Sequence, residues 1–159
     1  MEKLKVLLDE ANKSIKSASH MLYVTYPLVK DTKLFMGILE NINKALQLSM
    51  NALLYYERMY KRINPFHDNF NVKLDVFRRV VSRRYNISND VPNLIMEINE
   101  IIRNRKAAPI EIAKKTEFVI CDKEYRTRAL KHEELKNYFL KAKVFILQTS
   151  NIVNAGANI

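Results

Sequence analysis

Few side chains in this sequence could take part in acid–base chemistry or hold a metal. They are three histidines and one cysteine: His20, His67, His132 and Cys121. No histidine lies at metal-ligand spacing from another histidine or from the cysteine, and the Glu-x-x-His step of di-metal helical bundles is missing. With only two glycines, the chain lacks the glycine-rich loops that hold nucleotide phosphates. We therefore expect neither a metal nor a cofactor.

Two arginine–histidine pairs have a spacing that could serve phosphate chemistry. Arg62 precedes His67 with four residues between them, and Arg126 precedes His132 with five. An arginine could hold a phosphate while a histidine transfers a proton near neutral pH. With ten arginines in 159 residues, such spacings also arise by chance. We keep Arg62 and His67 as an alternative catalytic pair. The sequence favours a non-enzymatic protein but does not decide whether the protein is an enzyme.

Basic side chains are the most prominent chemical feature. The formal net charge is +10, and residues 57–85 and 103–131 each carry a net +5, whereas residues 86–102 carry −3. Such blocks suit a polyanionic partner, although an evenly solvated, lysine-rich surface would have the same composition. The candidate polyanion-binding residues are Lys61, Arg62, Arg78, Arg79, Arg83, Arg84, Arg103, Arg105 and Lys106.

A long helix from Leu34 to Ile63 is the element around which the chain is organised. Its apolar residues recur at alternating steps of three and four, which predicts a helix packed against several others. The heptad positions are Phe35, Leu39, Ile42, Leu46, Ser49, Leu53, Tyr56, Tyr60 and Ile63. We expect Tyr55, Tyr56 and Tyr60 to line the bundle interior and its edge, although they could form a stacking platform.

Four further helices follow from similar periodicity and from stop signals. We expect helices over about 2–26 (ended by Pro27), from Pro65 or His67 to 84, from about 88 to 102, and over about 131–154. Asp31 or Thr32 can cap the long helix. The period fails over 117–130, where a short β-hairpin is predicted, with a helix continuing from Ile112 as the alternative. The fold class is mainly α: an antiparallel bundle of about five helices in one domain, 1–154, followed by a frayed tail, 155–159.

Three segments carry a resemblance to known proteins. The stretches SASHMLYVTYPLVKDTKLF, ALLYYERMYKRINPFHDNF and EFVICDKEYRTRAL resemble a group of small archaeal helical-bundle proteins of unknown activity, over most of the chain. That resemblance implies a helical bundle and assigns no functional residue. The first two predicted helices and the arginine–histidine spacing are also similar to HEPN bundles, many of which cleave RNA, and this likeness concerns the fold.

The preferred function is a binding module that meets RNA, DNA or another polyanion through its basic surface. One alternative is a scaffold that self-associates or docks a protein partner through surplus apolar surface at Leu48, Leu54 and Tyr55; a HEPN-like ribonuclease is the other. The charged N-terminal segment is unlike a signal peptide, and no apolar run is long enough to span a bilayer. We expect a soluble, cytoplasmic protein without a membrane partner.

Overall fold

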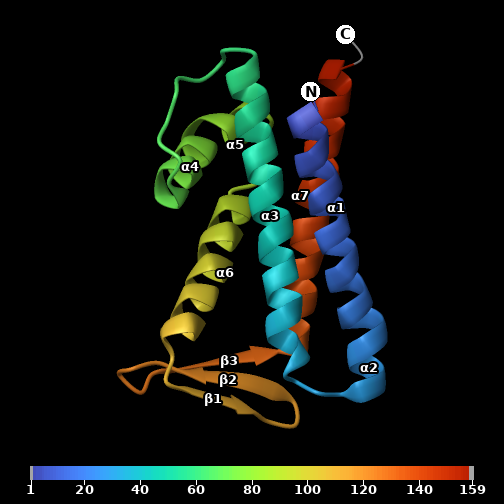
Figure 1. Cartoon of the computed structure of the whole chain (residues 1–159), viewed down its shortest axis with the longest axis vertical. Helices are drawn as coiled ribbons and strands as arrows, with labels where there is room; N and C mark the ends of the chain where they lie inside the picture. Colours follow the sequence, from blue (N-terminus) through green and yellow to red (C-terminus); the bar gives the residue numbers. More distant parts are fainter. Residues whose placement is uncertain (1, 158–159) are drawn as a thin grey trace.

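The computed structural model describes residues 2–157 and shows a mainly α-helical protein with a small antiparallel sheet (Figure 1). Its α-helices are α1 (Glu2–His20), α2 (Tyr26–Val29), α3 (Leu34–Met59), α4 (Phe70–Val76), α5 (Ser82–Arg84), α6 (Asp90–Ala107) and α7 (His132–Ala157). The π-helical turns η1 (Met21–Thr25) and η2 (Phe77–Val81) join α1 to α2 and α4 to α5, so the described chain has five continuous helices. The predicted fold class is confirmed.

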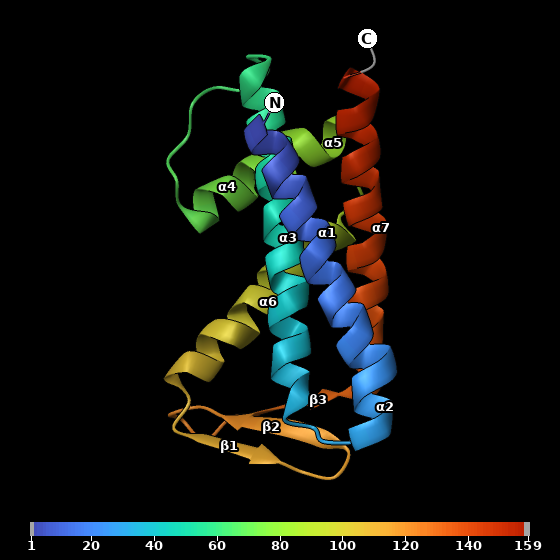
Figure 2. The same cartoon turned by 45° about the vertical axis from the view of Figure 1, so that its right-hand side comes forward.

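The three longest helices lie side by side along the long axis of the molecule. α3 runs antiparallel to α1, and α7 lies beside both (Figures 1 and 2). The sheet closes one end of this bundle, and α4 and α5 lie near the other end. α6 connects the two ends of the bundle, because it starts near α5 and ends beside the sheet.

The first helix does not stop before Pro27 as the sequence predicted; it continues to Val29. The physical reason is the π-helical turn. In that turn the Tyr26 N–H bonds to the Met21 carbonyl, five residues back, and Pro27 falls in the first turn of α2, where a missing N–H costs little. Lys30, in the left-handed region at φ 54°, then ends the helix.

The core face of α3 was predicted correctly from Phe35 to Tyr56, and all of these heptad positions are buried. The helix ends at Met59, before the predicted Ile63. Two backbone bonds close its end: Lys61 N–H to the Arg58 carbonyl (3.0 Å) and Arg62 N–H to the Glu57 carbonyl (2.9 Å). With Lys61 at φ 57°, this is a Schellman closure, and it turns the chain back toward the helix it has just left.

A second face of α3 is buried as well. Met36, Met50, Leu54 and Glu57 are buried in addition to the heptad positions. They are covered because α3 is the central helix, packed between α1 and α7 and also against η2 and α6. Leu54, expected to be surplus apolar surface, is only 1% exposed. That expectation was wrong for Leu54, because a helix in the middle of a bundle has little free surface.

The next two helices differ from prediction mainly at their ends. α4 begins at Phe70 and not at Pro65 or His67, because Asn69 caps it by accepting from the N–H groups of Asn71 (2.9 Å) and Val72 (3.3 Å). The predicted apolar stripe of α6 is buried, and the helix continues to Ala107.

The sheet consists of β1 (Ile110–Ala113), β2 (Glu117–Cys121) and β3 (Thr127–Lys131) in the order β1-β2-β3. The predicted hairpin over 117–130 is confirmed as the β2–β3 pair, and the alternative helix from Ile112 is wrong. β1 was not predicted; all four of its residues are exposed. The Thr32 hydroxyl, proposed as a helix cap, instead donates to the Lys114 carbonyl (2.7 Å) beyond β1, which ties the α2–α3 loop to the sheet.

α7 follows β3 without an intervening loop, since Lys131 ends the strand and His132 begins the helix. It continues to Ala157, three residues beyond the predicted end at residue 154. The rest of the expected tail, 158–159, lies outside the described residues.

Candidate functional site

The predicted basic residues fall into two groups at opposite ends of the molecule. Those between residues 61 and 84 lie at the end where α3 finishes, and those between 103 and 106 lie where α6 reaches the sheet (Figures 1 and 2). The sequence could not show whether these segments meet. In the fold they form separate surfaces.

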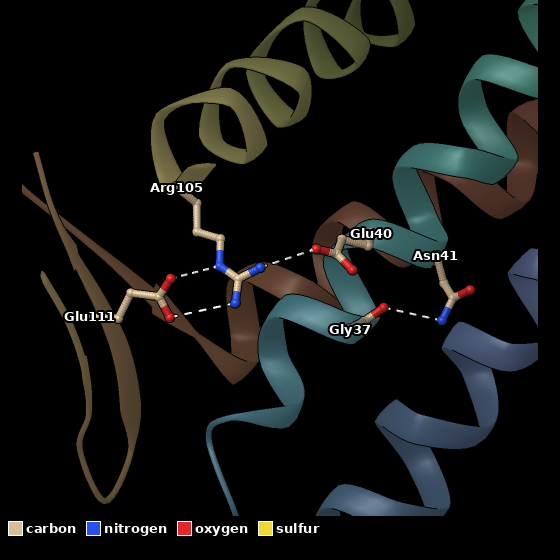
Figure 3. Close-up of polar contacts among 5 residues, drawn as sticks. All are labelled: Gly37, Glu40, Asn41, Arg105 and Glu111. Atoms are coloured by element: carbon tan, nitrogen blue, oxygen red, sulfur yellow. Dashed lines mark hydrogen bonds and ion pairs between the residues drawn. The ribbon is translucent and has the colours of Figure 1, made fainter. Parts of the chain in front are cut away.

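At the sheet end, Arg105 holds elements together. Its Nε atom lies 2.8 Å from Glu111 Oε1 on β1, and its Nη1 atom lies 3.5 Å from Glu40 Oε1 on α3 (Figure 3). Beside this contact, the Asn41 amide donates to the Gly37 carbonyl within α3 (Figure 3). Arg103 and Lys106 are exposed. Of the three basic residues at this end, Arg105 is therefore already paired with two carboxylates.

At the other end, a buried carboxylate gathers two of the predicted arginines. The Glu57 side chain is 0% exposed, and its Oε1 accepts from Arg62 Nη1 at 3.3 Å. Arg84 Nε lies 3.4 Å from the other oxygen, Oε2. The Tyr85 hydroxyl donates to Oε1 and also accepts from Arg62 Nη1 at 3.2 Å. We call Glu57, Arg62, Arg84 and Tyr85 the Glu57 cluster.

Tyr85 stays protonated in this cluster at neutral pH. Burial, together with its hydrogen bond to Glu57, raises the pKa of Tyr85 to about 12. A neutral hydroxyl can donate to the carboxylate, whereas a phenolate would repel it. Tyr85 therefore acts as a fixed donor that holds Glu57 beside the two arginines.

Two tyrosines complete the surface around Arg62. The guanidinium lies over the rings of Tyr60 and Tyr56, with its central carbon 4.9 Å and 5.5 Å from the two centroids. The rings meet edge to face at 5.1 Å. Tyr56 is buried, as predicted, but Tyr60 is 46% exposed.

The cluster leaves an excess of positive charge at the surface. The side chains of Arg62 and Arg84 remain 37% and 42% exposed above the single buried carboxylate. Lys61 and Arg83, the chain neighbours of the two arginines, are exposed. Four cations against one carboxylate give this surface, Lys61–Arg62 with Arg83–Arg84, a net charge of +3.

The other candidate residues on this side are engaged elsewhere. Arg78 donates to Asn93 Oδ1 on α6 (3.2 Å), and Arg79 pairs with Asp75 one turn earlier (2.7 Å). His67 is exposed in the loop before α4, while the Arg62 guanidinium is held by Glu57 and Tyr85. In the second arginine–histidine pair, Arg126 bonds Asp122 (3.0 Å) and Glu124 (2.9 Å) at the β2–β3 turn.

His132 of that pair packs among aromatic rings. Its ring lies 4.7 Å from that of Tyr26 and 6.4 Å from that of Phe35. In both pairs, the arginine is thus already bound to carboxylates.

The sequence offered Tyr60 as part of an alternative stacking platform, but it did not point to Glu57 or Tyr85 as part of a site. The available signal was a glutamate next to a heptad position, followed by an arginine five residues later. Arg84 and Tyr85 lie 27 and 28 positions away, and only tertiary packing brings them to Glu57.

Exposed apolar surface lies on α7. Leu140, Val144 and Leu147 recur at steps of four and three and are each more than half exposed. Of the residues expected to provide such surface, Leu48 and Tyr55 are half-buried and Leu54 is buried.

Over residues 2–157, no three histidine, cysteine or acidic side chains gather in a group that could hold a metal ion. In the same range, no helix has the length and apolar character needed to cross a bilayer. No protein-family model matches the chain, and no curated protein matches it. The resemblances drawn from the sequence therefore stay predictions.

Proposed function

We propose that this protein binds single-stranded nucleic acid through the surface formed by Lys61, Arg62, Arg83 and Arg84 with Tyr60. The observation that carries the proposal is the arrangement of two guanidiniums, each more than a third exposed, on one fully buried carboxylate.

Fixed guanidiniums favour phosphate binding. A free arginine loses side-chain freedom when it binds a phosphate, whereas Glu57 and Tyr85 already hold Arg62 in place. Guanidinium N–H groups that do not face Glu57 remain available for phosphate oxygens, which they match in geometry. Neighbouring Lys61 and Arg83 add attraction that depends on salt.

An exposed aromatic ring beside these cations favours single strands over duplexes. Bases that are not stacked in a duplex can stack on tyrosine, which contributes about 1–3 kcal/mol per base. Tyr60 is about half exposed and lies under the Arg62 guanidinium. A strand would thus find a phosphate site and a stacking surface next to each other.

The test is fluorescence anisotropy of a labelled 12-nucleotide RNA or DNA strand at several salt concentrations. Lys61→Gln and Arg83→Gln should each weaken binding and reduce the salt slope by about 1, because each removes one phosphate contact. Arg103→Gln, an equal charge change at the opposite end, is the control and should have little effect. Tyr60→Leu should weaken binding to the strand more than binding to heparin.

Two results would contradict the proposal. One is undetectable binding of any strand at low salt. The other is an equal loss of affinity in Arg103→Gln and in Arg83→Gln, since this would indicate a general attraction to a basic surface.

Self-association is a second candidate function, favoured by the apolar stripe on α7. Pairing two copies of α7 antiparallel would place Leu140 of one copy against Leu147 of the other, so the stripe is complementary to itself. The exposed Lys141 and Lys143 lie beside it, and salt screens their mutual repulsion. Association should therefore strengthen with salt, whereas strand binding weakens. Light scattering that shows a monomer at all concentrations and salts would exclude self-association, and Leu147→Asp should abolish any dimer.

A further inference from the structure

The outer edge of β1 is not covered by any other segment among residues 2–157. β1 is the outermost strand of the sheet, at the end of the bundle opposite the Glu57 cluster (Figures 1 and 2). All residues from 109 to 116 are exposed. An uncovered edge strand presents unpaired backbone N–H and C=O groups, to which another extended chain can bond. β1 is therefore a candidate docking edge.

Two residues of β1 direct their backbone groups away from the sheet. The Lys114 N–H donates to the Glu117 carbonyl (2.9 Å), which makes these two residues a hydrogen-bonded pair of the hairpin. Such pairs alternate with non-bonded pairs along an antiparallel ladder, so the next bonded pair toward the start of β1 is at Ile112. Glu111 and Ala113, on either side of Ile112, therefore face outward. No other segment of the described chain bonds to their backbone groups.

The two faces of β1 differ in character. Ile120 of β2 packs into the core, and Glu111, which lies opposite it, is on the same side of the sheet. Ile110 and Ile112 therefore lie on the outer face, where they are 45% and 47% exposed. A strand added to β1 would gain from apolar side chains placed beside these two isoleucines.

Lysines flank the free edge at both ends. Lys106 lies near the end of α6, before β1, whereas Lys114 and Lys115 directly follow β1, and all three are exposed. Among the described residues, the one ion pair of these lysines is that of Lys114 with Glu117, at 3.9 Å. Pairing two copies of β1 would bring these cations together, whereas an acidic chain would be attracted to them. The charges therefore favour an acidic partner over a second copy.

We propose that the β1 edge binds an extended, acidic segment of another protein, which adds a fourth strand to the sheet. The outward backbone groups of Glu111 and Ala113 bond to the segment. Its alternate apolar side chains lie beside the two isoleucines, and acidic residues at its ends meet the three lysines. This site goes beyond the proposed function, because it takes a protein partner at the opposite end of the molecule.

The experiment measures fluorescence anisotropy of a labelled synthetic peptide mixed with the full chain. The probe is a nine-residue peptide in which three valines alternate with two threonines and two acidic residues stand at each end. The same peptide with lysine at the four terminal positions is the control. The acidic peptide should bind at least about tenfold more tightly, and its affinity should fall as salt rises.

Two variants locate the binding edge. Lys115→Gln should weaken the acidic peptide several-fold, whereas Lys5→Gln, an equal charge change near the start of α1 at the other end of the molecule, should have no effect (Figure 1). Ala113→Pro removes one outward N–H without removing a bond to β2, and proline is tolerated at such edge positions. This variant should abolish peptide binding.

Two N-methylated peptides test the backbone pairing without any change to the protein. The threonines of the bound peptide lie opposite Glu111 and Ala113 and donate their N–H groups to β1, whereas the valine N–H groups point away. Methylation of the threonine nitrogens should therefore abolish binding, and methylation of the valine nitrogens should not. The bound acidic peptide should also slow hydrogen exchange at the amides of Glu111 and Ala113.

Several results would overturn the proposal. They are undetectable binding of the acidic peptide, equal affinity for the acidic and the lysine-ended peptides, and equal effects of the two methylation patterns. A dimer in light scattering that Ala113→Pro dissociates would assign the edge to a second copy instead. Lys115→Gln should leave RNA binding unchanged, so a failure of nucleic-acid binding at the Glu57 cluster leaves this proposal standing, and the reverse also holds.

Discussion

At the scale of single residues, Glu57 determines how the basic surface is arranged. Sequence periodicity places it next to a buried seam, and packing covers it completely. A buried carboxylate needs partners, and Arg62, Arg84 and Tyr85 supply them from two chain segments, the turn after α3 and the end of α5. A charge that would be unfavourable alone thus fixes two cations at the surface.

Glu57→Ala should destabilise the fold, since it leaves two arginines without their carboxylate. We expect a loss of about 2–3 kcal/mol in the free energy of unfolding, less than for fully buried pairs because both guanidiniums are partly solvated. Urea denaturation measures the change. Glu133→Ala, at a carboxylate that is 82% exposed, is the control and should alter stability by less than about 0.5 kcal/mol. Similar losses in the two variants would mean that Glu57 is not buried among its partners.

Tyr85 should make stability depend on alkaline pH. Its pKa is raised from 10.0 to about 12 in the folded state, so the protonated hydroxyl favours the fold. This contribution is fully present below pH 10 and is lost as the pH rises through 12. The stability of wild type relative to Tyr85→Phe should therefore fall between pH 10 and pH 12. A constant difference across that range, measured by chemical denaturation, would contradict the assigned environment.

At the scale of elements, the ends of α3 and α7 meet so closely that a glycine is required. A Cβ atom at Gly156 would lie 1.8 Å from the Tyr56 hydroxyl. The contact brings the last turns of α7 against the part of α3 that precedes Glu57. Helix propensity alone would favour alanine at this position.

Gly156→Ala should consequently lower the melting temperature, although alanine is the better helix former. Gly37→Ala is the matched control, because its Cβ would meet only the mobile end of the Met21 side chain at 2.8 Å. We expect the control to be near neutral, and the double variant Gly156→Ala with Tyr56→Phe to recover part of the loss. A stabilised Gly156→Ala protein would show that the two helix ends are further apart.

At the scale of the whole molecule, β2 and β3 pack Phe118, Ile120 and Leu130 into the core, whereas a few polar contacts attach β1 to the bundle. Arg105 links α6 to β1 and α3 (Figure 3), and Thr32 links the α2–α3 loop to the segment after β1. β1 itself is exposed along its length and adds no buried side chain. Its attachment therefore depends on hydrogen bonds and ion pairs more than on packing.

Arg105→Met should loosen β1 while the distant helices keep their stability. Hydrogen exchange should become faster at the β1 amides and stay unchanged in α4, because the removed contacts reach only the sheet and α3. Arg103→Met, two residues away on the exposed side, should change neither. Faster exchange throughout the protein would mean that the sheet and the bundle unfold together.

The sequence predicted the parts of this fold that depend on local pattern. The α3 and α6 stripes each have a helical period that a single segment displays, and the β2–β3 hairpin was predicted where that period fails. The end of the first helix was predicted wrongly, because the sequence gives no signal for the π-helical turn that accommodates Pro27. The Glu57 cluster could not be predicted, because Arg84 and Tyr85 reach Glu57 only after two separate segments have packed.

The position of the single cysteine at the β2–β3 hairpin makes it a suitable point for attaching the protein to a surface. Cys121 ends β2, at the end of the molecule opposite the last turn of α3 (Figure 1). A protein tethered to a surface through this one thiol would have a uniform orientation, with Lys61, Arg62, Arg83 and Arg84 directed away from the support. Cys121 is thus a single attachment site for single-molecule and surface-binding measurements. Attachment through it leaves the face proposed to bind nucleic acid unobstructed.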